Sequence, residues 1–174
     1  TEAIVDHIEL VNKKYGANHF DFTDLTLAVK KSWLTDFCNQ MIKEKMPITW
    51  GLPSGTRSEV LDYEMLSLLR KAGLNDIDYA PESGSKKILE VMKKQISVPK
   101  VLNSLRSAVK AKMRIKVNII IGYPEETRYN FFETWLFCVK CALIGVDDLL
   151  VMGLSIYPGS EVHNQIRKER NIIY

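Results

Sequence analysis

The sequence predicts an α/β domain built on a parallel sheet of about five strands. Helix and strand patterns alternate from end to end of the 174 residues, as is typical of βαβ units. No linker rich in Gly, Pro or Ser interrupts residues 1–174, so we expect a single domain. A closed eight-stranded barrel usually needs ~250 residues. The sheet is therefore expected to be an incomplete barrel or an open sheet.

The first half of the chain predicts three helices and two strands. Apolar residues at helical spacing predict helices at residues 2–15 and 30–45, and a third helix that Gly73 closes at its C-terminal end. Between these helices, residues 18–24 and 48–52 have the pattern of strands. These segments would form the first βα units of the sheet.

The second half continues the alternation. Pro99 favours the first turn of a helix, where the missing N–H of proline is tolerated. The tail from Ser160 is expected to be a helix or a frayed end. The remaining elements are predicted as a strand and loop at 76–83, a short helix at 85–94, a helix from Pro99 to about 112, a strand at 115–121, a helix at about 126–144 and a strand at about 148–157.

The segment VNIIIGYPEET (117–127) is the most informative stretch of the sequence. Its apolar strand contains one polar residue, Asn118, and is expected to be covered by helices on both faces, as in other parallel sheets. Gly122 lets another group approach the backbone, and Glu125 and Glu126 suit a helix N-terminus. Because ligands bind at the carboxyl ends of strands in such folds, we expect a ligand here.

Asn118 has two interpretations. A polar side chain inside a buried strand needs a hydrogen-bond partner. A ligand hydroxyl would supply the partner if Asn118 faces the barrel interior, and a side chain on a neighbouring strand would supply it otherwise. The sequence alone leaves both interpretations open.

Polar or small residues follow every predicted strand. Because the carboxyl ends of parallel strands lie at one edge of a sheet, these residues are expected to converge. Carboxylates, a hydroxyl and a cation together suit a small polar ligand with amine and carboxylate groups. The residues are Thr23 and Asp24, Pro53 to Arg57, Glu82 and Ser83, Gly122 to Glu125, and Tyr157 to Glu161.

Composition and charge narrow the function classes. The net charge of +3 is too small to indicate nucleic acid as a partner. The sequence has no apolar run of the ~18 residues that a membrane span needs. Three cysteines do not make a disulfide framework, which indicates a reducing compartment, and we expect a cytoplasmic protein. The chain begins at Thr1 rather than Met, so we expect a piece of a longer protein.

The cysteines and histidines do not predict a metal site. Cys138 and Cys141 form a CxxC pair, but the pair lies in an apolar helical stretch with no second CxxC or His pair nearby. Cysteines in such surroundings behave as small apolar residues, and Cys38 is interpreted in the same way. The histidines, which have no ligand spacing, are His7, His19 and His163.

Five sequence blocks, taken in order, resemble the radical S-adenosylmethionine (SAM) superfamily. The resemblance is strongest to the branch whose members often carry a cobalamin-binding domain, and it covers nearly the whole chain. It implies a partial TIM-type (β/α)6 barrel with SAM bound across the strand ends. The blocks are HFDFTD, TRSEVLDYEMLSLLRKAGL, YAPESGSKKILEVMKK, VNIIIGYPEET and SIYPGSE.

The resemblance also implies which residues contact SAM. Each residue takes its role from its position in a matching block, and an ammonium group opposite the SAM carboxylate is chemically reasonable. The roles are Asp24 at the SAM amino group, Arg57 as a further contributor, Glu82 and Ser83 near the ribose and methionyl part, Lys94 at the carboxylate, Asn118 at the ribose hydroxyls and Gly122 on the adenine side.

The superfamily's CxxxCxxC motif, whose thiolates hold a [4Fe–4S] cluster, does not occur in this sequence. We therefore expect a fragment of a radical SAM enzyme, of the Fe–S oxidoreductase or methyltransferase type, that carries the SAM-binding wall without the cluster ligands. The resemblance implies that the parent cleaves SAM reductively, or uses cobalamin to transfer a methyl group, and acts on a small-molecule substrate. The fragment itself is expected to be inactive and to bind SAM weakly or not at all.

Two other function classes are alternatives. One is a cluster-free α/β barrel enzyme of another class, although the sequence has no Gly-rich phosphate loop to support it. The other is a non-catalytic binding module. A sheet edge exposed where the first strand is missing would promote self-association, which would resemble the behaviour of such a module.

Overall fold

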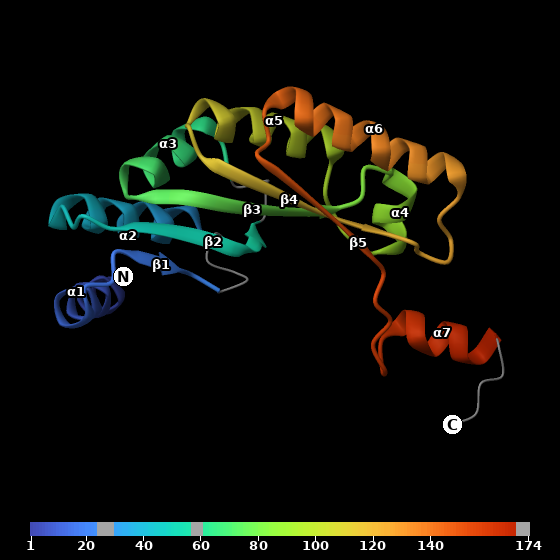
Figure 1. The fold of residues 1–174 in the computed structure, drawn as a ribbon, viewed down its shortest axis with the longest axis horizontal. Helices are drawn as coiled ribbons and strands as arrows, with labels where there is room; N and C mark the ends of the chain where they lie inside the picture. Colours follow the sequence, from blue (N-terminus) through green and yellow to red (C-terminus); the bar gives the residue numbers. More distant parts are fainter. Residues whose placement is uncertain (24–29, 57–60, 170–174) are drawn as a thin grey trace.

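A computed structural model describes residues 1–23, 30–56 and 61–169. The described strands form one open sheet in the order β1-β2-β3-β4-β5, and every neighbouring pair is parallel (Figure 1). The predicted parallel α/β fold is therefore confirmed, and the sheet does not close into a barrel. The strands are β1 (His19–Asp21), β2 (Thr49–Thr56), β3 (Leu74–Glu82), β4 (Arg114–Ile121) and β5 (Asp148–Gly153).

Four helices, α2, α3, α5 and α6, lie along one face of the sheet, and α7 lies beyond the end of β5 (Figure 1). Across the described ranges, no helix combines the length and the apolar character that crossing a membrane requires. The helices are α1 (Glu2–Tyr15), α2 (Lys31–Glu44), α3 (Tyr63–Lys71), α4 (Lys86–Val91), α5 (Val98–Lys110), α6 (Arg128–Ile144) and α7 (Glu161–Glu169).

Three strands differ clearly in length from the prediction. β1 covers only His19–Asp21, whereas a strand was predicted at 18–24. The last strand ends at Gly153 rather than near residue 157. β2 continues past residue 52 to Thr56, through Pro53. Proline lacks an N–H and is tolerated only where no ladder bond is needed. The pairing of β2 with β3 is irregular between Leu52 and Thr56, so Pro53 interrupts no regular ladder.

The hydrophobic core lies between the sheet and the helical layer. Phe37 of α2 and Trp50 of β2 are both fully buried and meet edge to face, with ring centroids 5.5 Å apart. Trp50 Nε1 donates a hydrogen bond to the carbonyl of Ala72 at 2.8 Å, where α3 ends. Ile77 of β3 and Ile115 of β4 are also fully buried. This packing holds the strands, and with them the strand ends, in fixed positions.

The opposite face of the sheet carries charged side chains on β3 and β4. Asp78 on β3 pairs with Lys116 on β4 at 2.7 Å, and Asp76 pairs with Arg114 at 3.6 Å. Because side chains alternate along a strand, Asn118 lies on the same face as Lys116, and it is half-buried. The expectation that helices cover both faces of β4 is wrong, because charged and polar side chains occupy one of them.

The solvent side of α6 is unusually apolar. Its exposed apolar residues recur every three or four positions and therefore form one stripe along the helix. Phe132 and Trp135 stack with their ring centroids 5.6 Å apart. The helix is thus apolar beyond what the core requires. The stripe consists of Phe132, Trp135, Leu136, Val139 and Leu143.

Candidate functional site

The end of β3 carries a carboxylate in an unusual backbone conformation. Glu82 has a φ of 67°, in the left-handed region that residues other than glycine rarely adopt. Its Oε1 lies 2.8 Å from Nζ of Lys94, which follows α4 in the sequence and also donates to the carbonyl of Ala80 at 2.9 Å. The Glu82 side chain is 17% exposed and that of Lys94 is 35% exposed. The pair is therefore partly shielded but still reachable from solvent.

Ser83 lies beside this pair, but its side chain points away from solvent. The residue is fully buried, and its hydroxyl lies 2.9 Å from Oγ1 of Thr134 on α6. The same hydroxyl accepts a hydrogen bond from the backbone N–H of Ser85 at 3.0 Å. In this structure Ser83 anchors the loop after β3 to α6.

The end of β4 supplies an unsatisfied acceptor and an open backbone position. Oδ1 of Asn118 is buried and has no hydrogen-bond partner among the described residues, so it makes no bond to a neighbouring strand. Gly122 has a φ of 91°, and a Cβ placed on it would meet no atom within 4 Å. Its N–H donates to Oε2 of Glu126 at 2.6 Å. The backbone here is fixed, while the space in front of Gly122 is free.

The ends of β3 and β4 are close enough to influence each other electrostatically. Partial burial raises the pKa of Tyr123, and the carboxylates of Glu82 and Glu125 raise it further. Two predicted residues, Asp24 and Arg57, lie outside the described residues. The structure thus brings Glu82 and Lys94 together at one strand end, beside the next strand end, which carries Asn118 and Gly122.

Glu125 and Glu126 lie ahead of α6 rather than in its first turn. The helix begins at Arg128, with Thr127 as its N-cap. The two carboxylates are engaged elsewhere, since Glu126 accepts from Gly122 and Glu125 accepts from Nε2 of Gln165 at 3.3 Å. The predicted helix start is therefore two residues too early.

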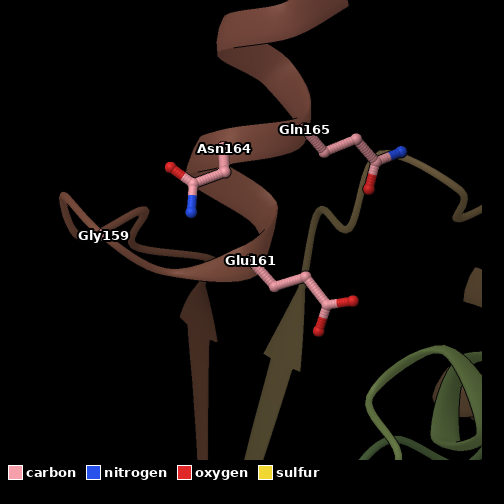
Figure 2. A pocket seen from close by; sticks show the side chains of 4 residues that line it. All are labelled: Gly159, Glu161, Asn164 and Gln165. Carbon is pink, nitrogen blue, oxygen red and sulfur yellow. The ribbon is translucent and has the colours of Figure 1, made fainter.

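A hollow lies at the start of α7. It has a volume of about 460 Å³, and Gly159, Glu161, Asn164 and Gln165 line it. Figure 2 shows Glu161 and Gln165 directed to one side of α7 and Asn164 to the other. Both oxygens of Glu161 bond Nζ of Lys93, at 2.8 Å and 2.6 Å. α7 is thereby tied to the turn that also carries Lys94.

The residues present do not fit an iron–sulfur cluster. Cluster ligands are cysteine thiolates. Burial raises the pKa of Cys38 and that of Cys141 to about 12, which disfavours the thiolate that a cluster needs. Among the described residues, no group of three His, Cys, Asp or Glu side chains is placed to hold a metal ion.

Thr134 and Asn130 are site-related residues that the sequence did not predict. Thr134 is 2% exposed and Asn130 is 3% exposed, and both face the loop after β3. Two polar residues four positions apart in a largely apolar helix share one face. That spacing was a signal that α6 contacts a polar segment.

Residues 1–135 match the family described as the radical SAM superfamily. The chain is 27% identical over 134 residues to the anaerobic magnesium-protoporphyrin IX monomethyl ester cyclase of Cereibacter sphaeroides, covering 76% of this chain and 22% of that protein. It is 24% identical over 161 residues to an uncharacterized methyltransferase of Pyrococcus horikoshii, covering 92% of this chain and 34% of that protein. The chain thus spans about a third or less of the length of these relatives.

A solved structure supports the fold. The structure of the radical S-adenosylmethionine methyltransferase TsrM from Kitasatospora setae, with cobalamin and a [4Fe–4S] cluster bound, superposes with a TM-score of 0.81. The superposition covers 97% of this chain and 31% of that one, at 13% identity. The family match over residues 1–135 shows that this chain belongs to the radical SAM superfamily, as the resemblance in its sequence implied.

Proposed function

We propose that this chain forms one wall of a SAM-binding site in a radical SAM enzyme. The observation that carries the proposal is the buried, unpartnered Oδ1 of Asn118, which lies on the strand that leads to the open backbone at Gly122. A buried acceptor without a partner is costly unless a ligand satisfies it. The ribose hydroxyls of SAM are donors that would satisfy it.

Each described residue of the wall would have a distinct role. Lys94 would pair with the SAM carboxylate, and Glu82 would hold the ammonium group of Lys94 in place. Asn118 would accept a hydrogen bond from the ribose, and Gly122 would admit the adenine to the backbone. Ser83 would act through the loop that it anchors. Asp24 and Arg57 would contribute from the neighbouring strand ends.

SAM bound with a [4Fe–4S] cluster supplies reductive cleavage chemistry, and cobalamin would add methyl transfer in the parent protein. Because the cysteines of this chain do not fit a cluster, we propose that the cluster ligands lie outside residues 1–174. The isolated chain would then be inactive and bind SAM weakly or not at all. The parent would act on a small-molecule substrate in the cytoplasm.

Two substitutions test the wall. The test uses a longer protein that also contains the residues encoded upstream of this chain and that carries a reconstituted cluster. In it, Lys94→Met and Asn118→Ala should each weaken SAM binding about tenfold. Equilibrium dialysis with SAM measures the effect. Lys86→Met is the matched control, because this lysine belongs to α4 and its side chain is 90% exposed.

Two results would contradict the proposal. Unchanged SAM affinity in both the Lys94 and the Asn118 variants would show that these residues do not line the SAM site. A stable cluster on the isolated chain of 174 residues, detected by its absorbance after reconstitution with iron and sulfide, would show that the ligands lie within it.

A further inference from the structure

The left-handed backbone of Glu82 needs support on both sides. On its N-terminal side, β3 is held by pairing with β4, where Glu82 lies opposite Ile119. On its C-terminal side, the support comes from α6 and not from the sheet. A residue other than glycine keeps such a conformation only where its surroundings impose it. The contacts of residues 83–85 with α6 therefore decide whether the Glu82 carboxylate stays on Lys94.

Thr134 is at the centre of these contacts. Its Oγ1 lies 2.9 Å from the Ser83 hydroxyl and accepts from the backbone N–H of Gly84 at 3.3 Å. It also donates to the carbonyl of Asn130 at 3.1 Å, one turn earlier in α6. One buried hydroxyl thus links the helix backbone to two consecutive residues of the loop.

A second set of bonds holds the far end of the loop. The hydroxyl of Ser85, which is fully buried, donates to Oε2 of Glu133 at 2.6 Å. Nδ2 of Asn130 donates to the same hydroxyl at 3.1 Å. These buried groups satisfy one another, so losing one leaves its partners unpaired.

The same end of α6 also holds the other half of the site. Glu126 accepts from the N–H of Gly122, and the next residue, Thr127, caps the helix. The loop after β3 and the loop after β4 are therefore both fastened to the N-terminal part of α6. The position of the Glu82–Lys94 pair relative to Gly122 depends on this one helix.

We infer that Thr134 is a positioning residue of the site: it holds the loop after β3 so that Glu82 keeps its left-handed backbone and its contact with Lys94. The ligand to which this matters, SAM, rests on the proposed function. The effect on Glu82 and Lys94 does not depend on any ligand. Thr134 itself touches neither SAM nor reacting atoms, because Ser83 and Gly84 lie against it.

Nuclear magnetic resonance of the 174-residue chain tests the structural step. Thr134→Val keeps the shape of the side chain but removes the hydroxyl. The coupling constant between the amide and α protons of Glu82 should move away from the value expected of a left-handed backbone. The contact between the Lys94 ammonium group and Glu82 should be lost, and amide hydrogen exchange at Gly84 should accelerate about tenfold. Thr134→Ser restores the hydroxyl and should restore the wild-type signals.

Thr35→Val is the matched control, because the Thr35 hydroxyl donates to the carbonyl of Lys31 one turn earlier on the exposed side of α2. It should leave Glu82 and Lys94 unchanged. If the folded Thr134→Val protein retains wild-type Glu82 and Lys94 signals, the inference is wrong. Should that variant not fold, Ser83→Ala removes the same bond from the loop side and is judged by the same signals.

The SAM affinity of the cluster-bearing protein separates this inference from the proposed function. Thr134→Val should weaken SAM binding about tenfold, and Thr134→Ser should not. If Lys94→Met weakens SAM binding but Thr134→Val does not, the positioning role of Thr134 is contradicted and the proposed SAM-binding wall is not. If Lys94→Met leaves SAM binding unchanged while Thr134→Val still displaces Glu82, the positioning role of Thr134 is supported and the proposed SAM site is contradicted.

Discussion

Gly84 is the residue at which α6 comes closest to the loop after β3. A Cβ at this position would lie 2.3 Å from Cβ of Phe137 and 3.0 Å from the carbonyl oxygen of Glu133. Because helix backbone cannot move aside as a flexible side chain can, Gly84→Ala should lower the free energy of unfolding by about 1–3 kcal/mol. Urea denaturation measures this change.

Gly153→Ala is the control for that substitution. A Cβ on Gly153 meets no atom within 4 Å. Its effect should stay within about 0.5 kcal/mol. Equal losses of stability at the two glycines would mean that the close approach of α6 does not restrict Gly84.

α6 begins with a capping box, in which the N-cap residue and the third helical residue each bond the backbone of the other. Oγ1 of Thr127 accepts from the N–H of Asn130 at 3.3 Å, and Oδ1 of Asn130 accepts from the N–H of Thr127 at 3.2 Å. Thr127→Ala should therefore lower the free energy of unfolding by about 1 kcal/mol, measured in thermal melts. Ser97 caps α5 without a side-chain hydrogen bond, so Ser97→Ala should cost less. A larger loss at Ser97 would contradict the assigned role of the capping box.

At the same scale, the sequence predicted the elements well where local signals determine them. Alternating apolar patterns and the stop signal Gly73 locate helices and strands without tertiary information. The start of α6 was less predictable, because Glu126 is drawn to the N–H of Gly122 instead of entering the helix.

The candidate site, too, could be predicted from the sequence only in part. Asn118 and Gly122 could be singled out because one is a polar residue within an apolar strand and the other is a glycine directly after it. The role of Thr134 was not, since it bonds Ser83 across 51 positions of sequence. Such a contact depends on how α6 packs, which no local pattern specifies.

For the whole molecule, alkaline pH should be destabilising. Burial raises the pKa of Tyr79 from 10.0 to about 12, and the thiols of Cys38 and Cys141 from 9.0 to about 12. The unfolded chain releases these protons at a lower pH than the folded chain does. The stabilisation is therefore complete below pH 9 and is lost as the pH rises toward 12.

Thermal melts at increasing pH measure this loss. Tyr79→Phe should flatten the decline above pH 10, because its phenol no longer ionises on unfolding. Tyr15→Phe changes a side chain that is 69% exposed and serves as the control. An identical decline in wild type and Tyr79→Phe would contradict the prediction.

The free edge of β1 should promote self-association. β1 ends the described sheet, and a hollow of about 440 Å³ lies between it and α1, lined in part by Ile4, Ile8 and Phe20. Unpaired edges pair readily with other strands. Sedimentation velocity should show association that rises with concentration and that Ile4→Lys reduces. Leu10→Lys, on α1 but outside the hollow, should not reduce it, and a monomer at every concentration would contradict the prediction.

The two faces of the sheet have different roles. The apolar face packs against the helices and forms the core, whereas the other face carries the Asp78–Lys116 and Asp76–Arg114 pairs. Exposed side chains on that second face can therefore be replaced without loss of core packing. This separation gives a physical reason why one scaffold serves relatives as different as a porphyrin ester cyclase and a methyltransferase.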